Sequence, residues 1–393
     1  MDRTTPPHIL TLVAATSVGA LATNVFLPSL PGMAREFGVP YATAGLMVSV
    51  FLAANAALQL VIGPLSDRFG RRPVMLVAMT LFVAASFAAL FASDMTTLLA
   101  LRAVQAASAA GMVLSRAIVR DTVDAEGAAS RLGYITMGMT VAPMIGPMIG
   151  GGLDAPFGWR GGWVVMLAVG VVALGAAYFD LGETNKHRAD SFAAQFRAWP
   201  TLLGSAAFWG YALAGGFTGG VYFALLGGGP AVASGALAMS PTSFGAHLVL
   251  IGIGYMTGNF VSGRYSRRAG LHVMMFAGNI VVAVGLLIAA ALFLAGATHP
   301  LALFAPMMLL GLGNGVTLPS SAAGLVSVMP RLAGSASGLG GSIQIAISAV
   351  MSVAAGAVVE ANPSPLPLLM LMLASTVAAL AFTGLARHGS RAE

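Results

Sequence analysis

The sequence predicts an all-α membrane protein with twelve transmembrane helices in two lobes of six, and three observations support this. Apolar residues form 58% of the 393-residue chain and charged residues only 8%, whereas soluble domains carry about 25% charged residues. Residues 198–263 and 269–330 contain no Asp, Glu, Lys or Arg, and each run has room for two spans of about 20 residues. A basic segment at 67–72 recurs at 263–268.

The composition excludes soluble enzymes, nucleic-acid binders and disulfide-stabilised secreted domains. The chain has no cysteine, which removes disulfides, thiolate catalysis and cysteine metal sites. Its apolar runs lack the alternation of outer-membrane strands, so the spans are expected to be helices. The 50 glycines and 20 prolines are typical of close packing and bends among membrane helices.

Each predicted span is an apolar run between charged or turn residues. The first run continues past Ala20-Leu21-Ala22, which resembles a signal-peptidase site, so we expect it to remain as a span. In the first half the spans are 8–30, 41–62, 74–93, 97–119, 130–153 and 161–181. In the second half they are 202–226, 243–263, 271–296, 300–323, 333–359 and 365–386.

The cations predict the orientation of these spans. With the amino terminus inside, sixteen of the nineteen Lys and Arg residues lie on the cytoplasmic side, as the positive-inside rule requires. Arg35 and Arg160 then lie outside, and Arg102 lies within a span. Both termini are therefore expected to be cytoplasmic.

The longest polar segment divides the chain near its middle. We expect an amino-terminal six-helix lobe at 1–181, a cytoplasmic linker at 182–200 and a carboxy-terminal six-helix lobe at 201–393. Because the basic segment recurs at half the chain length, the lobes are expected to be parallel repeats. That arrangement is typical of carriers whose site lies between the halves.

The segment from Gly63 to Arg72, Gly-Pro-Leu-Ser-Asp-Arg-Phe-Gly-Arg-Arg, closely resembles the signature of the major facilitator superfamily between helices two and three. Asp67 lies at a membrane boundary and is expected to pair with a nearby Arg or a helix terminus. The resemblance implies a conformational switch, whose salt bridge favours the outward-facing state. Its residues are Gly63, Asp67, Arg68, Gly70, Arg71 and Arg72.

Residues 142–151 resemble the antiporter motif of the twelve-helix drug:proton antiporters in this superfamily. The glycines offer a smooth packing face and the proline bends the helix. Segments 27–31 and 116–121 are similar to the branch that exports bicyclomycin and chloramphenicol. The motif residues are Pro143, Gly146, Pro147, Gly150 and Gly151.

The resemblance also implies a substrate cavity midway through the membrane, lined chiefly by helices one, four, seven and ten. Arg102, followed by Gln105, resembles the arginine motif of helix four. It either reaches the outer interface or faces the cavity, where it could bind an anionic substrate. The candidate substrate or coupling residues are Asn24, Arg102, Gln105, Tyr134, Phe217, Tyr222, Phe223, Asn314 and Gln344.

One feature departs from the family pattern. All thirteen acidic residues lie in loops or at span ends, whereas proton coupling needs a group that titrates in the membrane core. Where these exporters commonly carry Asp, the first span has Asn24. His247 could carry a proton, but a lone His more often packs against neighbours.

The leading interpretation is a multidrug or small-molecule efflux transporter of the bacterial inner membrane, which exchanges small amphipathic substrates for protons by alternating access. The alternative is a carrier without proton coupling, or an exporter of sugars, metabolites or organic anions. An enzyme is not expected, because the sequence lacks paired catalytic groups, the His-Glu-x-x-His pattern and a phosphate-binding loop. We expect a monomer in the lipid bilayer, with no cofactor, no metal and no nucleic acid.

Overall fold

The computed structural model describes residues 7–122, 135, 142–143, 145–185, 199–329, 332–362 and 364–392, and its regular structure in these ranges is helical. Eleven helices in the described ranges are long and apolar enough to cross a membrane. The predicted span at 130–153 lies mostly outside these ranges, although residues 145–157 are helical. The all-helical fold is therefore confirmed, and the count of twelve stays a prediction.

Two spans of the first half are broken into shorter helices. The first span changes from α-helix to 3-10 helix at Leu27–Ser29, where Pro28 interrupts the α-helical hydrogen bonding. The fourth span begins after Asp94, whose carboxylate accepts the Thr97 N–H at 2.8 Å. This hydrogen bond lowers the pKa of the Asp94 carboxyl group. The elements are α1 (Ile9–Asn24), η1 (Leu27–Ser29), α2 (Leu30–Glu36), α3 (Tyr41–Phe69), α4 (Arg71–Ala89), α5 (Met95–Gln105), η2 (Ala106–Ser108), α6 (Ala109–Thr122) and α8 (Arg160–Asp180).

Most helices of the second half are longer than their apolar runs, although α13 ends two residues before the end of its run at 271–296. The span expected at 243–263, for example, continues to Ala269, because its basic end extends the helix without adding apolar residues. The elements are α10 (Trp199–Leu203), α11 (Ala206–Gly235), α12 (Pro241–Ala269), α13 (Leu271–Leu294), α14 (Leu301–Val328), α15 (Ala333–Ala361) and α16 (Pro365–Ala392).

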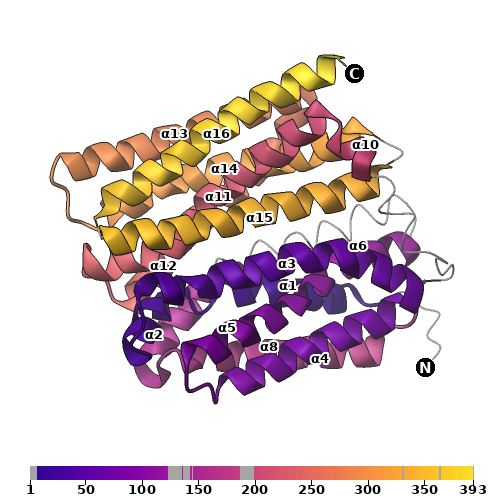
Figure 1. The fold of residues 1–393 in the computed structure, drawn as a ribbon, viewed down its shortest axis with the longest axis horizontal. Helices are drawn as coiled ribbons and strands as arrows, with labels where there is room; N and C mark the ends of the chain where they lie inside the picture. The colour runs from indigo at the N-terminus through magenta and orange to yellow at the C-terminus, as the bar shows by residue number, and fades with distance from the viewer. Residues whose placement is uncertain are drawn as a thin grey trace.

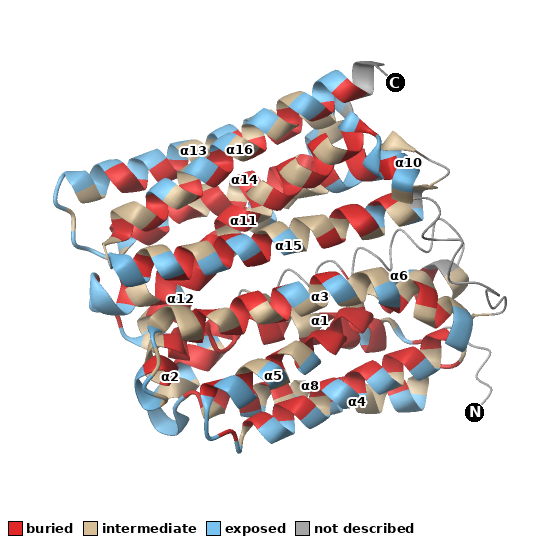
Figure 2. Cartoon of the chain, in the orientation of Figure 1, coloured by how far each residue is buried: buried red, intermediate tan, exposed pale blue. Residues whose placement is uncertain are grey.

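The helices of the two chain halves gather into two bundles, and the start of α1 and the end of α16 lie at the same end of the molecule (Figure 1). We call this the terminal end and the opposite one the far end. Large apolar side chains such as Phe91 and Phe260 are more than 70% exposed, and exposed positions recur along the outer helices (Figure 2). An exposed apolar surface of this extent is suited to contact with lipid.

The two bundles are joined by hydrogen bonds near the far end. The Tyr41 hydroxyl donates to the carbonyl of Gly227 at 2.8 Å, and the Ala42 N–H donates to the Glu360 carboxylate at 2.6 Å. Beside these contacts, α3 and α15 pack against each other across the interface (Figure 1). The halves are thus held together at the end away from the termini.

Candidate functional site

A cavity of about 350 Å³ lies between the two bundles. The first half contributes the end of α1 and Pro143, and the second half contributes α11, α12 and α14. Its described lining residues are Ala20, Thr23, Asn24, Pro143, Gly219, Tyr222, Phe223, Leu248, Ile251, Gly252, Tyr255, Leu310, Gly311, Asn314 and Leu318.

Asn24 and Tyr222 connect the halves at this cavity. The Tyr222 hydroxyl donates to Oδ1 of Asn24 at 3.3 Å, while Nδ2 of Asn24 donates to the carbonyl of Ala20 at 3.1 Å. Phe223 also lines the cavity and meets the Tyr222 ring edge-on, with 5.4 Å between centroids. The structure therefore brings three of the sequence-derived candidates together.

Asn314 joins them from α14, on the second half of the molecule. Its side chain is only 3% exposed, and its Oδ1 has no hydrogen-bond partner among the described residues. A buried polar atom without a partner is costly, and seven other buried side-chain atoms among the described residues share this condition.

Two other candidates, Phe217 and Gln344, are absent from the described lining of the cavity. The Phe217 ring stacks on Phe382 of α16, with 5.6 Å between centroids. Gln344 donates to the Ser321 hydroxyl at 3.1 Å within the second bundle. Tyr134 lies outside the described residues.

Arg102 is enclosed in the first bundle, and neither sequence-based alternative describes its position. Its side chain is fully buried, so it does not reach an interface, and it is absent from the described cavity lining. The rings of Phe26 and Phe51 lie 4.5 and 4.4 Å from its guanidinium carbon, and Trp163 lies at 5.8 Å. Because aromatic faces attract cations, this enclosure stabilises the guanidinium, to which no acidic side chain of the described residues is bonded.

A short polar chain continues from Arg102. Its Nε donates to the carbonyl of Met47 at 3.1 Å, and Nη1 donates to Oε1 of Gln105 at 2.9 Å. Gln105 in turn donates to the Ser86 hydroxyl at 2.7 Å. Arg102 and Gln105 thus act together to join α3, α4 and α5 inside the first bundle.

The segment from Gly63 to Arg72, here called the switch segment, forms the end of α3 and the start of α4. The loop that was expected there is reduced to one residue. Helix α3 continues through Phe69, and α4 begins at Arg71. Gly70 between them has a φ of 103°, a conformation that favours glycine, and its N–H donates to the carbonyl of Ser66. The polar residues of the motif can remain helical because a single glycine suffices to reverse the chain.

Arg71 is the centre of the switch segment. It is buried and contacts the carboxylates of Asp67 at 2.6 Å and Asp121 at 3.1 Å, so Asp67 pairs with a nearby Arg as expected. All three residues belong to the first half, and these ion pairs therefore do not cross between the bundles. The other motif residues are placed as follows: Arg68 stacks on Phe69, Arg72 donates to the carbonyl of Tyr178, and Gly63 faces open space.

Sequence reasoning missed Glu183 and Asn185, which follow α8. Oε1 of Glu183 accepts the N–H groups of Arg71 and Asn185, both at 2.9 Å, and Nδ2 of Asn185 donates to the carbonyl of Asp67 at 2.8 Å. A Cβ on Gly70 would overlap the Glu183 carboxylate. These hydrogen bonds fix the start of the linker to the switch segment. The signal in the sequence that could have revealed this contact was an acidic residue directly after a span.

The antiporter motif packs across the interface between the bundles. A Cβ on Gly151 would overlap the carbonyl of Pro241, and one on Gly245 would overlap the carbonyl of Pro147. The Thr242 hydroxyl donates to the carbonyl of Gly151 at 2.8 Å. Within the first half, Gly150 lies against Val25 and Gly146 against Leu21.

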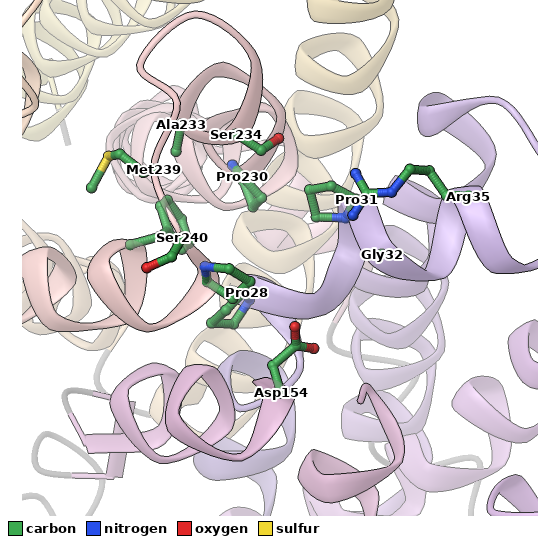
Figure 3. A pocket seen from close by; sticks show the side chains of 12 residues that line it. Pro28, Pro31, Gly32, Arg35, Asp154, Pro230, Ala233, Ser234, Met239 and Ser240 are labelled. Carbon is green, nitrogen blue, oxygen red and sulfur yellow. The ribbon is translucent and has the colours of Figure 1, made fainter. Parts of the chain in front are cut away.

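A smaller cavity of about 220 Å³ lies nearer the far end. Pro28, Arg35 and Asp154 of the first half face Ser234 and Ser240 of the second half around it (Figure 3). It is therefore a second space along the same interface between the bundles.

His247 is packed within the second bundle. Its Nδ1 lies 2.7 Å from the carbonyl of Ser243, and its ring lies 5.3 Å from that of Phe304. It does not belong to the described lining of either cavity.

Comparison with known proteins agrees with this architecture. The chain is 28% identical to multidrug resistance protein D of Escherichia coli over 93% of this chain and 92% of that protein. It is 29% identical to a chloramphenicol resistance protein of Pseudomonas aeruginosa, over 81% and 76% of the two chains. The resemblance to the drug-exporter group is thereby confirmed.

The fold has a solved counterpart in a bacterial homologue of the human lysosomal transporter Spinster, with a TM-score of 0.76 and 16% identity over 98% of this chain and 96% of that one. Residues 12–344 match the family model of the Major Facilitator Superfamily, whose members are transporters rather than enzymes. The chain is therefore a multi-pass membrane protein that belongs to the Major Facilitator Superfamily.

Proposed function

We propose that the protein exports small amphipathic molecules across the bacterial inner membrane, in exchange for protons and by alternating access. This proposal rests on the cavity of about 350 Å³, here called the central cavity, whose walls come from both halves. Its size is in the range of pockets for drug-sized ligands, roughly 300–1,000 Å³. The names of the multidrug and chloramphenicol resistance relatives support the substrate class.

Alternating access requires the two halves to tilt about the cavity. The bonds of Tyr41 and Ala42 to the second half lie toward the far end. If the termini are cytoplasmic, as the cations predict, this conformation is closed to the outside and accepts substrate from the cytoplasm. We expect a monomer, because one chain supplies both walls of the cavity.

The proposal also includes the coupling of substrate export to proton movement. No Asp, Glu or His is among the described lining residues, and this favours the alternative of a carrier without proton coupling. In the coupled mechanism, Asp67, His247 or an acid at a span end carries the proton. The two candidates therefore differ in whether substrate and protons move together.

Purified protein in liposomes with a trapped pH-sensitive dye distinguishes them. Under an imposed pH gradient, coupled exchange predicts a dye signal when chloramphenicol is added, and none with empty liposomes. Chloramphenicol movement with a silent dye supports the uncoupled carrier, whereas no movement of any tested drug contradicts export. Phe223→Leu should alter substrate preference, while Phe217→Leu, away from the cavity lining, serves as its matched control.

A further inference from the structure

The smaller cavity of about 220 Å³, here called the far-end cavity, differs from the central cavity because charged side chains line it. Arg35 comes from the last turn of α2, and Asp154 comes from the helical segment 145–157 of the first half. Ser234 and Ser240 face them from the second half (Figure 3). The described wall therefore carries one fixed charge of each sign and two hydroxyl groups.

Arg35 and Asp154 are not paired with each other or with any other described residue. Two other acidic side chains at the far end are bonded: Glu36 contacts Arg160 at 3.0 Å, and Glu360 accepts a backbone N–H at 2.6 Å. Two opposite charges that share a cavity without meeting are complementary to a molecule that carries both charges.

The serine hydroxyl groups add hydrogen-bonding capacity of both kinds. The Ser234 hydroxyl donates to the carbonyl of Ala231 at 3.3 Å, so its oxygen still has lone pairs that can accept. The Ser240 oxygen accepts the N–H of Ser243 at 3.2 Å, so its O–H is available to donate. An ammonium group and a carboxylate can therefore each gain a second partner besides the oppositely charged side chain.

The wall around these groups is stiff and can be reached from the surface. Four of the described lining residues are prolines, namely Pro28, Pro31, Pro230 and Pro241. A proline ring fixes the backbone φ angle, and a wall that is already ordered loses little freedom when a ligand binds. Because Arg35, Ser234 and Ser240 are exposed, the cavity opens to the surface near the far end.

The size and charges of the far-end cavity restrict what can bind there. Liquid water occupies about 30 Å³ per molecule, so a cavity of 220 Å³ accommodates roughly seven non-hydrogen atoms. A molecule with a single charge is attracted to one of the two charged side chains and repelled by the other, whereas a zwitterion gains at both. The described wall therefore selects a small zwitterion.

We propose that the far-end cavity is a binding site for a small zwitterion, with its anionic group at Arg35 and its ammonium group at Asp154, and that the bound molecule holds the far end closed. The ligand contacts both halves, and a ligand that binds only the closed arrangement increases the population of that arrangement. With the termini cytoplasmic, the site faces the outside of the membrane. The inference goes beyond the proposed function, because the two cavities share no described lining residue.

Saturation-transfer NMR tests binding to the purified full chain in the uncharged detergent dodecyl maltoside. 4-Aminobutanoate carries both charges, while butanoate and butylamine each lack one of them. We expect 4-aminobutanoate to bind about tenfold more tightly than either probe with a single charge.

Two variants should change this preference in opposite directions. Asp154→Asn removes the negative charge, so the variant should bind butanoate as tightly as 4-aminobutanoate. Arg35→Gln removes the positive charge and should do the same for butylamine. General damage to the fold cannot produce these opposite changes. Asp94→Asn is the control, because Asp94 caps its own helix and is absent from the described lining.

Distances between spin labels on α3 and α15 at the far end test the second part of the proposal. 4-Aminobutanoate should increase the closed population, and butanoate should not. Wild-type protein that binds butanoate or butylamine as tightly as 4-aminobutanoate would overturn the site, as would variants that keep the wild-type preference or the absence of saturable binding of 4-aminobutanoate. Binding with unchanged distances would overturn the role in holding the far end closed.

The same pair of charged groups occurs in a free solute such as an amino acid and in the headgroup of phosphatidylethanolamine. Nanodiscs of phosphatidylglycerol, with and without added phosphatidylethanolamine, distinguish these two sources. A headgroup in the site lowers the affinity for 4-aminobutanoate by competition, whereas an unchanged affinity assigns the site to a soluble zwitterion.

Discussion

Arg71 joins α3, α6 and the start of the linker at the terminal end. Its buried guanidinium contacts Asp67 and Asp121, and its backbone N–H donates to Glu183. Arg71→Met would leave two carboxylates without their cation. Because the carboxylates are partly exposed, we expect a loss of about 2–3 kcal/mol of stability rather than the full cost of a buried unpaired charge.

Chemical unfolding of the purified protein measures this loss. Arg264→Met is the matched control, since it removes an exposed cation from the corresponding basic segment of the second half. Equal stability of the two variants would show that the Arg71 network contributes nothing beyond an ordinary surface charge.

Arg102 provides a second test at this scale. Arg102→Ala removes a large side chain from between Phe26, Phe51 and Trp163 and leaves a void in the first bundle. We therefore expect a lower unfolding temperature and an equal reduction in transport of anionic and cationic compounds. Loss confined to anions would instead show that the guanidinium meets substrate in another conformation.

Individual residues could be assigned to the cavity from sequence only in part. Asn24 was a candidate because it stands where these exporters commonly carry Asp, and it does line the cavity. Phe217 was an equally reasonable candidate, yet it stacks on Phe382 within the second bundle. Helices that are apolar on all sides give no periodic signal of which face meets lipid, a neighbour or a cavity.

At the scale of helices, glycines set how closely the two halves approach. Gly245 on α12 lies against the carbonyl of Pro147, in the antiporter motif. Gly245→Ala would introduce a Cβ that overlaps this carbonyl and should separate α12 from the first half. We expect a smaller population of the conformation that is closed at the far end, with reduced transport.

Distances between spin labels on the two halves near the far end, on α2 and α11, measure the change. Gly263→Ala is the control on the same helix, because a Cβ there meets nothing within 4 Å. Identical distance distributions for both variants would contradict a role for this contact in closing the far end.

Helix identity was more predictable than helix ends. The apolar run at 41–62 indicated a span, but α3 continues to Phe69 through the polar switch segment. Hydropathy reports where a helix can lie in lipid, whereas hydrogen bonds and Gly70 determine where it stops. For the same reason, the capping role of Glu183 at the start of α4 was not visible in the composition of the linker.

At the scale of the whole molecule, two bundles that share one cavity must move as rigid bodies relative to each other, so that the cavity opens to one side of the membrane and then to the other. The packing of glycines against backbone is dense within the second bundle, as between α12 and α14, while few hydrogen bonds between described residues join the bundles. A basic segment that recurs at half the chain length implies two similar units, and the division at residues 182–200 stays a prediction. The conformation itself depends on contacts between units and could not be inferred from either repeat alone.

A covalent link across the far end tests this motion directly. The chain has no cysteine, so an introduced pair is unique, and a Cβ on Gly356 would lie 3.7 Å from Cα of Ala42 in the other half, close enough for a disulfide. Ala42→Cys with Gly356→Cys should stop transport on oxidation and regain it on reduction. Gly19→Cys with Ser108→Cys places a bridge inside the first bundle, where a Cβ on Gly19 lies 3.7 Å from that of Ser108, and should leave transport unchanged. Transport that persists through the oxidised far-end pair would mean that substrate crosses without separation of the halves there, and rigid-body alternating access would have to be abandoned.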